Sequence, residues 1–337
     1  MTNWTMGRFT KKASKGWISG NAVCCIHNGE TPDYRGRGGI LESADGGFSY
    51  SCFNCGFKTG WRPGWHIGFK LRKFMGWIGI DESAIKLLVF EAFRIRDEVG
   101  YVEPDKEEIS IEFEAKELPE GAKRIKALLT WYGMSDFENT PDDLMAVIDY
   151  ATDRGLTDTQ IANMYWTEKP INRLVKMNRR LIIPFTWDNE IIGYTARSID
   201  AGAQMKYQNV IDSNFVFNVD AQKPKSKVVL VSEGPMDALS IDGVAILGNA
   251  VSETKAEIIE RLNREVIVVP DRGDSGQKLV DVALEYGWTV SFPDWADDDV
   301  KDINDAVCQY GKLYTFQHVM KHKYDTRLKI ELMRKKY

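Results

Sequence analysis

The spacing of hydrophobic positions divides the chain into a helical part and a part rich in strands. Residues 180–197 form two apolar runs joined by polar Asp188 and Asn189, which predicts a β-hairpin. Before the hairpin, apolar side chains recur at helical spacing. The segments with this spacing are 82–97, 121–133, 141–154 and 158–166.

After the hairpin, short apolar runs alternate with segments of helix length. Strands separated in this way pair in parallel, and the intervening helices cross over the sheet. Residues 313–337 again have helical spacing. The pattern predicts a multi-domain α/β protein with a parallel sheet. The strands of this sheet are expected at 228–232, 244–247, 266–269 and 289–292.

Composition is that of a globular protein. The chain has 337 residues, of which 43% are hydrophobic and 28% charged, which is enough for two or three domains. No apolar run reaches the length of a membrane span, and the first residues lack the apolar core of a signal peptide. We therefore expect no membrane association and a cytoplasmic location. Five cysteines favour metal-binding thiols over a disulfide scaffold.

Charge is distributed unevenly around a formal net charge of -5. Residues 1–80 contain eleven Lys and Arg against four acids, whereas residues 81–120 contain five against thirteen. The acidic stretch is typical of a solvated linker that follows a basic module. From Lys321 onward, seven basic residues stand against two acids, so the last segment is basic again.

Two pairs of residues have the spacing of a structural zinc site. Cys24 and His27 are separated by two residues, as are Cys52 and Cys55, and a glycine-rich stretch lies between the pairs. Each pair can turn back in a knuckle that places both donors on one tetrahedral ion, and Gly56 permits the second reversal. Four ligands close the coordination shell, so we expect one structural Zn²⁺.

Neighbouring residues offer alternatives to these ligands. Cys25 is adjacent to Cys24, and adjacent side chains do not easily face one ion, so we assign Cys25 to packing. His66 has no partner at knuckle spacing and is assigned to an aromatic surface. Basic and aromatic residues alternate around the cysteines, a mixture that binds single strands, although about half of the aromatics are expected in the core. They are Arg35, Arg37, Lys58 and Arg62 with Tyr34, Phe48, Tyr50, Phe53, Phe57, Trp61 and Trp65.

Acidic residues follow the predicted parallel strands. Glu233 and Asp271 each stand just beyond a strand, Asp274 follows in the next turn, and Asp302 and Asp305 follow the last strand. The carboxyl ends of parallel strands meet at one edge, where ligand sites form. Converging carboxylates need a counterion, and Mg²⁺ accepts carboxylates together with water and phosphate oxygens. The competing interpretation is a helix cap, which is strongest for Asp305.

A basic segment precedes the acidic strand ends. Between Lys169 and Lys206, seven basic residues stand against three acids. Cations beside a magnesium site are what phosphoryl transfer on a polynucleotide requires, because they position phosphates while the metal stabilises developing charge. The alternative is a solvated charged surface.

These segments, in this order, resemble the bacterial and phage DNA primases that join an N-terminal zinc module to a Toprim core. In the zinc module, CCIH, TPDY and YSCFNCG resemble the family patterns CxxH, xPSF and hCFxCG. The resemblance implies Cys24, His27, Cys52 and Cys55 as zinc ligands. Within this family, the chain looks most similar to the stand-alone primases of T-even-type bacteriophages. No family motif is matched within residues 76–170.

The core motifs carry the resemblance further. RLIIPF, GYTAR and MKYQN resemble the family's RIxFPI, GxxxR and PKYLN segments, SEGPMDAL is similar to EGxxDxL, and KDINDAV looks like KDPxEhL. They imply substrate or template contacts at Arg180, Arg197, Lys206, Tyr207, Asp237 and Lys301. They imply catalysis and Mg²⁺ binding at Glu233 and Asp302.

One motif departs from the family pattern. In DRGDSG, Asp271 takes the first position of DxDxAG, Gly273 stands where the second Asp belongs, and Asp274 is displaced by one residue. We include Asp271 and Asp274 in the expected catalytic, Mg²⁺-binding set.

The resemblance implies a DNA primase that makes short RNA primers on single-stranded DNA from ribonucleoside triphosphates. It further implies one or two Mg²⁺ ions and a hexameric replicative helicase as partner. The alternatives are a non-catalytic zinc and Toprim recombination mediator that binds single-stranded DNA, or another Toprim phosphodiester enzyme. The expected segments are a zinc-ribbon template-binding domain (1–75), an acidic linker with a helix (76–120), the N-terminal subdomain of the polymerase core (121–227), a Toprim catalytic subdomain (228–312) and a basic helical tail (313–337).

Overall fold

The computed structural model describes most of the chain. The described residues are 9–12, 16–28, 30–100, 111–135, 139–169, 176–248, 250–274 and 276–337. They form two compact units, residues 1–109 with 260–264, and residues 110–259 with 265–337. The expected basic residues Arg8, Lys15 and Arg173 and part of the acidic linker lie outside the described residues.

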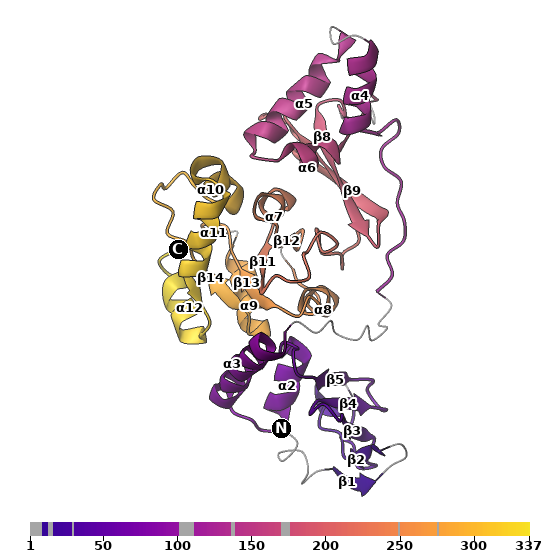
Figure 1. Ribbon diagram of the computed structural model, residues 1–337, viewed down its shortest axis with the longest axis vertical. Coiled ribbons are helices and arrows are strands. Elements are labelled where there is room, and N and C mark those ends of the chain that lie inside the picture. The colour runs from indigo at the N-terminus through magenta and orange to yellow at the C-terminus, as the bar shows by residue number, and fades with distance from the viewer. Residues whose placement is uncertain are drawn as a thin grey trace. The chain divides into compact units, whose positions relative to one another are not determined.

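The first unit contains a five-stranded antiparallel sheet whose strands follow one another in chain order. Its side chains alternate in burial along β4, as expected for a sheet with one covered face. Figure 1 shows this sheet with its strands side by side. The strands are β1 (Phe9–Lys12), β2 (Ile18–Gly20), β3 (Gly38–Glu42), β4 (Phe48–Cys52) and β5 (Lys58–Trp61).

Among its described residues, two α-helices complete this unit. They are α2 (Phe69–Trp77) and α3 (Glu82–Val99), so the helix predicted at 82–97 is confirmed. Asp81 caps α3 by accepting a hydrogen bond from its first turn, as a residue of this type does before a helix. Phe74 of α2 packs on Tyr50 of β4 with 4.3 Å between ring centroids, which joins helix and sheet in one core.

The second unit begins with another five-stranded antiparallel sheet, in the order β10-β9-β8-β7-β6. The predicted hairpin is confirmed as β8 and β9, and its turn residues Asp188 and Asn189 have φ of 50° and 67°. Two positive φ angles are the signature of the tight hairpin turn that matches strand twist. The strands are β6 (Lys123–Arg124), β7 (Tyr165–Trp166), β8 (Arg180–Trp187), β9 (Glu190–Ser198) and β10 (Tyr207–Val210).

The three helices predicted between 121 and 166 are also present. They are α4 (Ile125–Ser135), α5 (Asp142–Asp153) and α6 (Asp158–Ala162), and the last ends sooner than expected because residues 165–166 form β7. A capping box between Thr157 and Gln160 fixes the start of α6.

The third sheet contains the four predicted parallel strands, in the order β12-β11-β13-β14-β15. The last strand pairs antiparallel with β14 and was not expected, because it lies inside the segment predicted as a helical tail. The strands are β11 (Val228–Ser232), β12 (Val244–Ala245), β13 (Glu265–Val268), β14 (Thr289–Ser291) and β15 (Lys323–Tyr324).

Six helices accompany this sheet. Within the second unit, α10 packs against α7 and α11, and α12 packs against α9 (Figure 1). Arg334 of α12 donates to Gln277 of α9, which ties the basic end of the chain to the sheet. The helices are α7 (Pro235–Ile241), α8 (Glu253–Glu260), α9 (Gln277–Tyr286), α10 (Ile303–Tyr310), α11 (Lys312–Lys321) and α12 (Arg327–Arg334).

The two sheets of the second unit share one hydrophobic core. Phe185 of β8 packs against Phe215 and Phe217, and the same cluster includes Met236 of α7 and Ala245 of β12. The fold is therefore mixed α/β, with an antiparallel sheet and a mainly parallel sheet joined through buried side chains. Among the described helices, none is both long enough and apolar enough to cross a membrane.

Candidate functional site

Four thiols converge between β2 and β5 of the first unit. The Sγ atoms of Cys24, Cys25, Cys52 and Cys55 all lie within 4.8 Å of one another. Cys24 and Cys55 are 3.4 Å apart, and Cys25 and Cys52 are 3.6 Å apart. Thiolates bound tetrahedrally to one zinc at about 2.3 Å are about 3.8 Å apart, so the group fits a closed, structural Zn²⁺ site.

This set differs from the predicted ligands in one residue. A 3₁₀ turn (Cys25–His27) leaves Cys25 fully buried beside Cys52, whereas His27 stays exposed and stacks on Trp77. The two rings are 4.6 Å apart and nearly parallel. Cys25, which the sequence assigned to packing, therefore occupies the place expected for His27. The adjacent thiols both reach the group because the tight turn directs them to different partners.

Protonation of the thiols reflects their surroundings. Burial raises the pKa of the Cys24 thiol, and it raises that of Cys25 to about 11. Cys52 is also buried, but backbone N–H groups of Cys55 and Asn54 outweigh the burial and lower its pKa. Gly56 has the positive φ of 72° that the second knuckle requires. A bound cation would deprotonate the thiols and so release protons.

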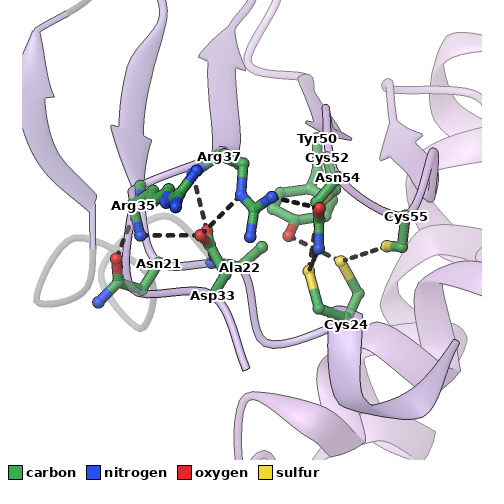
Figure 2. A network of polar contacts seen from close by, with 12 residues as sticks. Asn21, Ala22, Cys24, Asp33, Arg35, Arg37, Tyr50, Cys52, Asn54 and Cys55 are labelled. Atoms are coloured by element: carbon green, nitrogen blue, oxygen red, sulfur yellow. Dashed lines mark hydrogen bonds and ion pairs between the residues drawn. The ribbon is translucent and has the colours of Figure 1, made fainter. Parts of the chain in front are cut away.

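A buried carboxylate organises the loop between the two cysteine pairs (Figure 2). Asp33 accepts hydrogen bonds from the backbone N–H groups of Ala22, Arg35 and Arg37 at 2.7–2.9 Å, and from Arg37 Nε at 3.1 Å. Burial alone would raise the pKa of Asp33, but these four donors lower it to about 2. The carboxylate therefore remains charged and holds the loop closed.

The same network reaches the thiols. The guanidinium of Arg37 donates a hydrogen bond to the Asn54 side-chain oxygen. Asn54 Nδ2 in turn donates to Cys25 Sγ at 3.4 Å. On the other side, the Tyr50 hydroxyl lies 3.2 Å from Cys24 Sγ. Donors around coordinated sulfur fix its orientation, so Asn54 and Tyr50 are positioning residues for the thiol group.

The aromatic side chains of this module divide between core and surface, as expected. Phe48 and Tyr50 are buried, whereas Tyr34 and Phe53 are 81% and 85% exposed. His66 is buried rather than part of a surface, and burial lowers its pKa well below the ordinary value. The exposed rings are therefore the ones available for stacking.

Acidic residues gather at the carboxyl edge of the third sheet. Glu233 follows β11 directly, Asp271 follows β13, and Asp302 precedes α10 after β14. Because β11, β13 and β14 are neighbours, these side chains share one edge. Asp302 also caps α10, with Oδ1 accepting from Asp305 N at 2.7 Å, so the cap assigned to Asp305 belongs to Asp302.

The carboxylates at this edge influence one another. Burial, and then the charges of Glu233, Asp302 and Asp305, raise the pKa of Asp271 to about 7. Burial raises the pKa of Glu233, which the charge of Lys278 partly offsets. Within the described part of the chain, Glu233 Oε1 is buried without a hydrogen-bond partner. Such an acceptor is costly unless a cation or donor compensates it.

Asp237 lies behind this edge. It is buried in the first turn of α7, and its Oδ1 accepts from Asn304 N at 2.9 Å. Burial and the charges of Asp302 and Asp271 raise its pKa well above the ordinary value. Asp237 thus joins α7 to the start of α10 and adds to the repulsion that a cation would relieve.

Gly273 and Asp274 do not continue the acidic group. Gly273 has φ of +89°, a conformation that disfavours an L side chain, although a Cβ there would meet no atom within 4 Å. Asp274 is exposed, unlike Asp271. Among the described residues, the four thiols are the only group of three or more Cys, His, Asp or Glu ligand atoms that all lie within 4.8 Å of one another. The acidic group is therefore more open than the thiol group.

The residues present nevertheless fit a divalent cation. Buried carboxylates that lie close together have raised pKa values when no counterion is present, as Asp271 does, and Glu233 Oε1 accepts no hydrogen bond from the described residues. Mg²⁺ takes one or two carboxylates and completes its shell with water and phosphate oxygens. Lys301 lies beside Asp302, exposed, and its carbonyl accepts from Arg272 N at 2.8 Å.

The predicted substrate-binding cations have different surroundings. Arg180 is buried, and its guanidinium donates to the carbonyls of Ala196, Lys206 and Met205. Its pKa is lowered by burial. Arg180 therefore anchors the chain before β10, and Lys206 itself is exposed.

Arg197 and Tyr207 form a second arrangement. The Arg197 guanidinium lies 4.4 Å from the centroid of the Tyr207 ring, and its Nε donates to the Tyr150 hydroxyl at 3.1 Å. Burial raises the pKa of Tyr207, with the charges of Asp237 and Arg154 among the smaller influences. The Arg154 guanidinium lies 5.8 Å from the centroid of the same Tyr150 ring and 3.6 Å from Asp305 Oδ1, so these contacts link the arrangement to the acidic edge.

Arg154 is a site residue that the sequence reasoning missed. It follows α5, and its NH1 donates to Asn304 Oδ1 at 2.9 Å and lies 3.6 Å from Asp305 Oδ1. Although burial lowers its pKa, Tyr150 and the acids Asp305 and Asp302 raise it overall. No local signal marks Arg154, because its partners lie about 150 residues further along the chain.

Comparisons with known proteins give matches in solved structures only. No protein-family model matches the chain, and no curated protein does. The zinc-binding and RNA polymerase domains of the Aquifex aeolicus primase are 17% identical, with 93% of this chain and 81% of that chain covered and a TM-score of 0.44. The RNA polymerase domain of Mycobacterium tuberculosis primase DnaG is 18% identical, with 60% and 84% covered and a TM-score of 0.45.

A third similar structure is a DnaG primase catalytic domain bound to single-stranded DNA. It is 17% identical, with 59% of this chain and 78% of that chain covered and a TM-score of 0.44. These structural neighbours are DnaG-type primase cores, one of which includes a zinc-binding domain. The single-stranded DNA in the third structure is bound to that primase.

Proposed function

We propose that the chain is a DNA primase, which makes short RNA primers on single-stranded DNA. The observation that carries the proposal is the acidic edge, where Asp271 has a pKa raised to about 7 beside Glu233 and Asp302. The motifs around these residues resemble those of zinc and Toprim primases. Arg154 and Arg197 supply positive charge near the same edge, which suits a reaction between phosphates.

The chemistry follows from these groups. Glu233, Asp271 and Asp302 would hold one or two Mg²⁺, with Asp274 as a more distant contributor. Bound Mg²⁺ would lower the pKa of a ribonucleotide 3′-hydroxyl and neutralise the triphosphate that it attacks. Arg197 and Lys206 would bind phosphates of template or nucleotide, whereas Arg180 would act by anchoring their loop.

The zinc module would hold the template. Tyr34 and Phe53 are exposed, and the Phe53 N–H donates to the Arg37 carbonyl at 3.0 Å. Such a mixture of rings and cations stacks bases and neutralises phosphates. The domain roles expected for residues 1–75, 121–227 and 228–312 belong to this proposal. The proposal also includes a likeness to the stand-alone primases of T-even-type phages, a cytoplasmic location and a hexameric replicative helicase as partner.

The test is primer synthesis on unprimed single-stranded DNA with four ribonucleoside triphosphates and Mg²⁺. Wild type is expected to make short RNA, and Glu233→Gln is expected to lose at least about 100-fold in rate while still binding template. Glu117→Gln is a matched control, because Glu117 is exposed in the second unit.

Retained synthesis by Glu233→Gln, or equal loss in both variants, would contradict the assignment of the acidic edge. A recombination mediator without catalysis is the second candidate, and the absence of a carboxylate at Gly273 favours it. It predicts that wild type binds single strands, makes no RNA, and gains no synthesis from Gly273→Asp.

A further inference from the structure

The outward face of α4 combines an exposed indole with cations, and the proposed catalytic site does not use it. We call Lys126 and Trp131 of α4, together with Lys123 and Arg124 of the preceding β6, the α4 basic face. Arg124, Lys126 and Trp131 line a shallow, open depression of the surface, together with the small side chains Ala127 and Thr130. Trp131 is 58% exposed, an unusual position for so large an apolar ring.

Trp131 lies outside the buried core that α4 helps to form. The inward face of α4 is formed by Ile125 and Leu128, both buried, and Tyr132 packs against the same core. Trp131 stacks on Tyr132 with 5.6 Å between centroids and 19° between planes, and Lys123 Nζ lies 5.1 Å from its centroid. These contacts orient the indole while leaving more than half of it exposed.

The charge of the face is positive. Residues 121–135 contain three cations and no acid. Two acids among the described residues have partners, since Glu120 forms an ion pair with Lys169 and Glu168 accepts a hydrogen bond from Tyr132. Arg124 is directed by the Tyr165 hydroxyl, to which its Nε donates at 3.0 Å, and its guanidinium stays on the surface.

We propose that the α4 basic face is a separate binding site for single-stranded nucleic acid. One base would stack on Trp131, and Lys123, Arg124 and Lys126 would neutralise the adjacent phosphates. An unpaired base offers the flat apolar surface that an indole recognises, whereas a duplex hides it and an acidic peptide lacks it. The site lies outside the proposed catalytic residues and does not depend on catalysis.

The expected effects follow from this geometry. Removing one stacked base contact costs about 1–3 kcal/mol, so Trp131→Ala should weaken binding by about tenfold. Trp131→Phe keeps a ring and should keep most of the affinity. Each phosphate contact on a single strand contributes about 0.7 to the slope of log K against log salt, so Lys126→Gln should reduce that slope by about 0.7.

The experiment uses the full chain and fluorescent oligothymidylate of about 16 nucleotides, the upper range of one such binding surface. Anisotropy compares wild type, Trp131→Ala, Trp131→Phe and Leu328→Ala, the last an exposed apolar control on α12. Circular dichroism checks that each variant is folded. In parallel, a strand containing 5-iodouracil is photocrosslinked to wild type, and the modified peptide is identified by mass spectrometry.

The inference is supported if Trp131→Ala alone loses affinity and the crosslink maps to the peptide that contains Trp131. It is overturned if Trp131→Ala binds as wild type and crosslinks lie elsewhere, or if duplex DNA or polyglutamate competes as well as the single strand. Glu233→Gln should crosslink as wild type does. If wild type makes no RNA but the crosslink remains, the proposed primase activity fails and this site stands.

Discussion

The thiol group of the first unit and the acidic edge of the second both collect potential anions, but they do so differently. The four thiols lie within 4.8 Å of one another, and Asn54 and Tyr50 direct donors at them. The acidic edge is looser, and no described residue donates a hydrogen bond to the buried Glu233 Oε1. A closed set of ligands suits a structural ion, whereas an open set leaves room for substrate oxygens.

The difference has energetic consequences. In the thiol group, protein donors compensate the burial in part and a Zn²⁺ ion would complete the compensation, so we expect metal binding and folding to be coupled. At the acidic edge, burial and then the charges of neighbouring carboxylates raise the pKa of Asp271 to about 7, so this edge destabilises the cation-free protein at neutral pH. Stability therefore depends on the first site, and chemistry is expected at the second.

The largest expected effect is that of removing zinc. Cys24, Cys25 and Cys52 belong to the core of the first unit, and structural zinc in small modules contributes on the order of 10 kcal/mol to folding. A zinc chelator should abolish amide-exchange protection in β3 and β4 while β8 and β9 remain protected. Removal of Mg²⁺ should change neither region.

Protection in β3 and β4 that survives in demonstrably zinc-free protein would remove the contrast between the two sites. A matched measurement on the acidic edge uses Glu233→Gln, which should retain the same exchange pattern as wild type.

The second prediction concerns which residues hold the zinc. Cys25→Ser should lose bound zinc, because Cys25 Sγ belongs to the converging group, whereas His27→Ala should retain it, because His27 stacks on Trp77 instead. Metal content by mass spectrometry measures both. Zinc retained by Cys25→Ser and lost by His27→Ala would restore the ligand set predicted from spacing.

Sequence pattern was sufficient where the relevant interactions are local. The turn residues Asp188 and Asn189 predicted the hairpin, and the apolar runs predicted the four parallel strands, because period and turn chemistry are encoded within a few residues. The placement of acids at strand ends likewise indicated one shared edge, which the strand order supports.

Tertiary geometry decided the rest. Whether Cys25 or His27 faces Cys52 depends on the direction of one 3₁₀ turn, which two-residue spacing does not specify. Arg154 reaches the acidic edge from a distant helix, and β15 forms only because β14 offers a free edge. Such pairings between distant segments leave no periodic signal in the sequence.

The third prediction concerns the pH dependence of the acidic edge. The pKa of Asp271 rises from about 4 in the unfolded chain to about 7 in the fold, so the folded state binds the extra proton between these values. Stability of cation-free wild type should therefore fall as pH rises through this window. Asp271→Asn removes the ionisation and should be more stable than wild type at neutral pH by on the order of 2 kcal/mol.

Thermal melts at pH 4 to 8, in Mg²⁺-free buffer without chelator so that the thiol group keeps its zinc, measure this difference, which should vanish near pH 4 and grow toward neutrality. Asp274→Asn is the matched control, because Asp274 is exposed and should leave the pH profile unchanged. If Asp271→Asn and wild type differed in stability by the same amount at all pH values, ionisation of Asp271 would not be what destabilises the cation-free protein.

The smallest effect tests the donors around the thiols. Asn54→Ala removes the N–H that points at Cys25 Sγ and the oxygen that Arg37 contacts. Loss of a hydrogen-bond partner of a metal ligand typically lowers metal affinity by about tenfold or more, so zinc affinity should fall by about tenfold. Competition with a chromogenic chelator measures the retention. Asn21→Ala is the control, because Asn21 accepts from Gly36 N in the same region without reaching a thiol (Figure 2). Equal loss from both variants would mean that the network acts through the loop as a whole, and the contrast between a supported thiol group and an unsupported acidic edge would lose its structural basis.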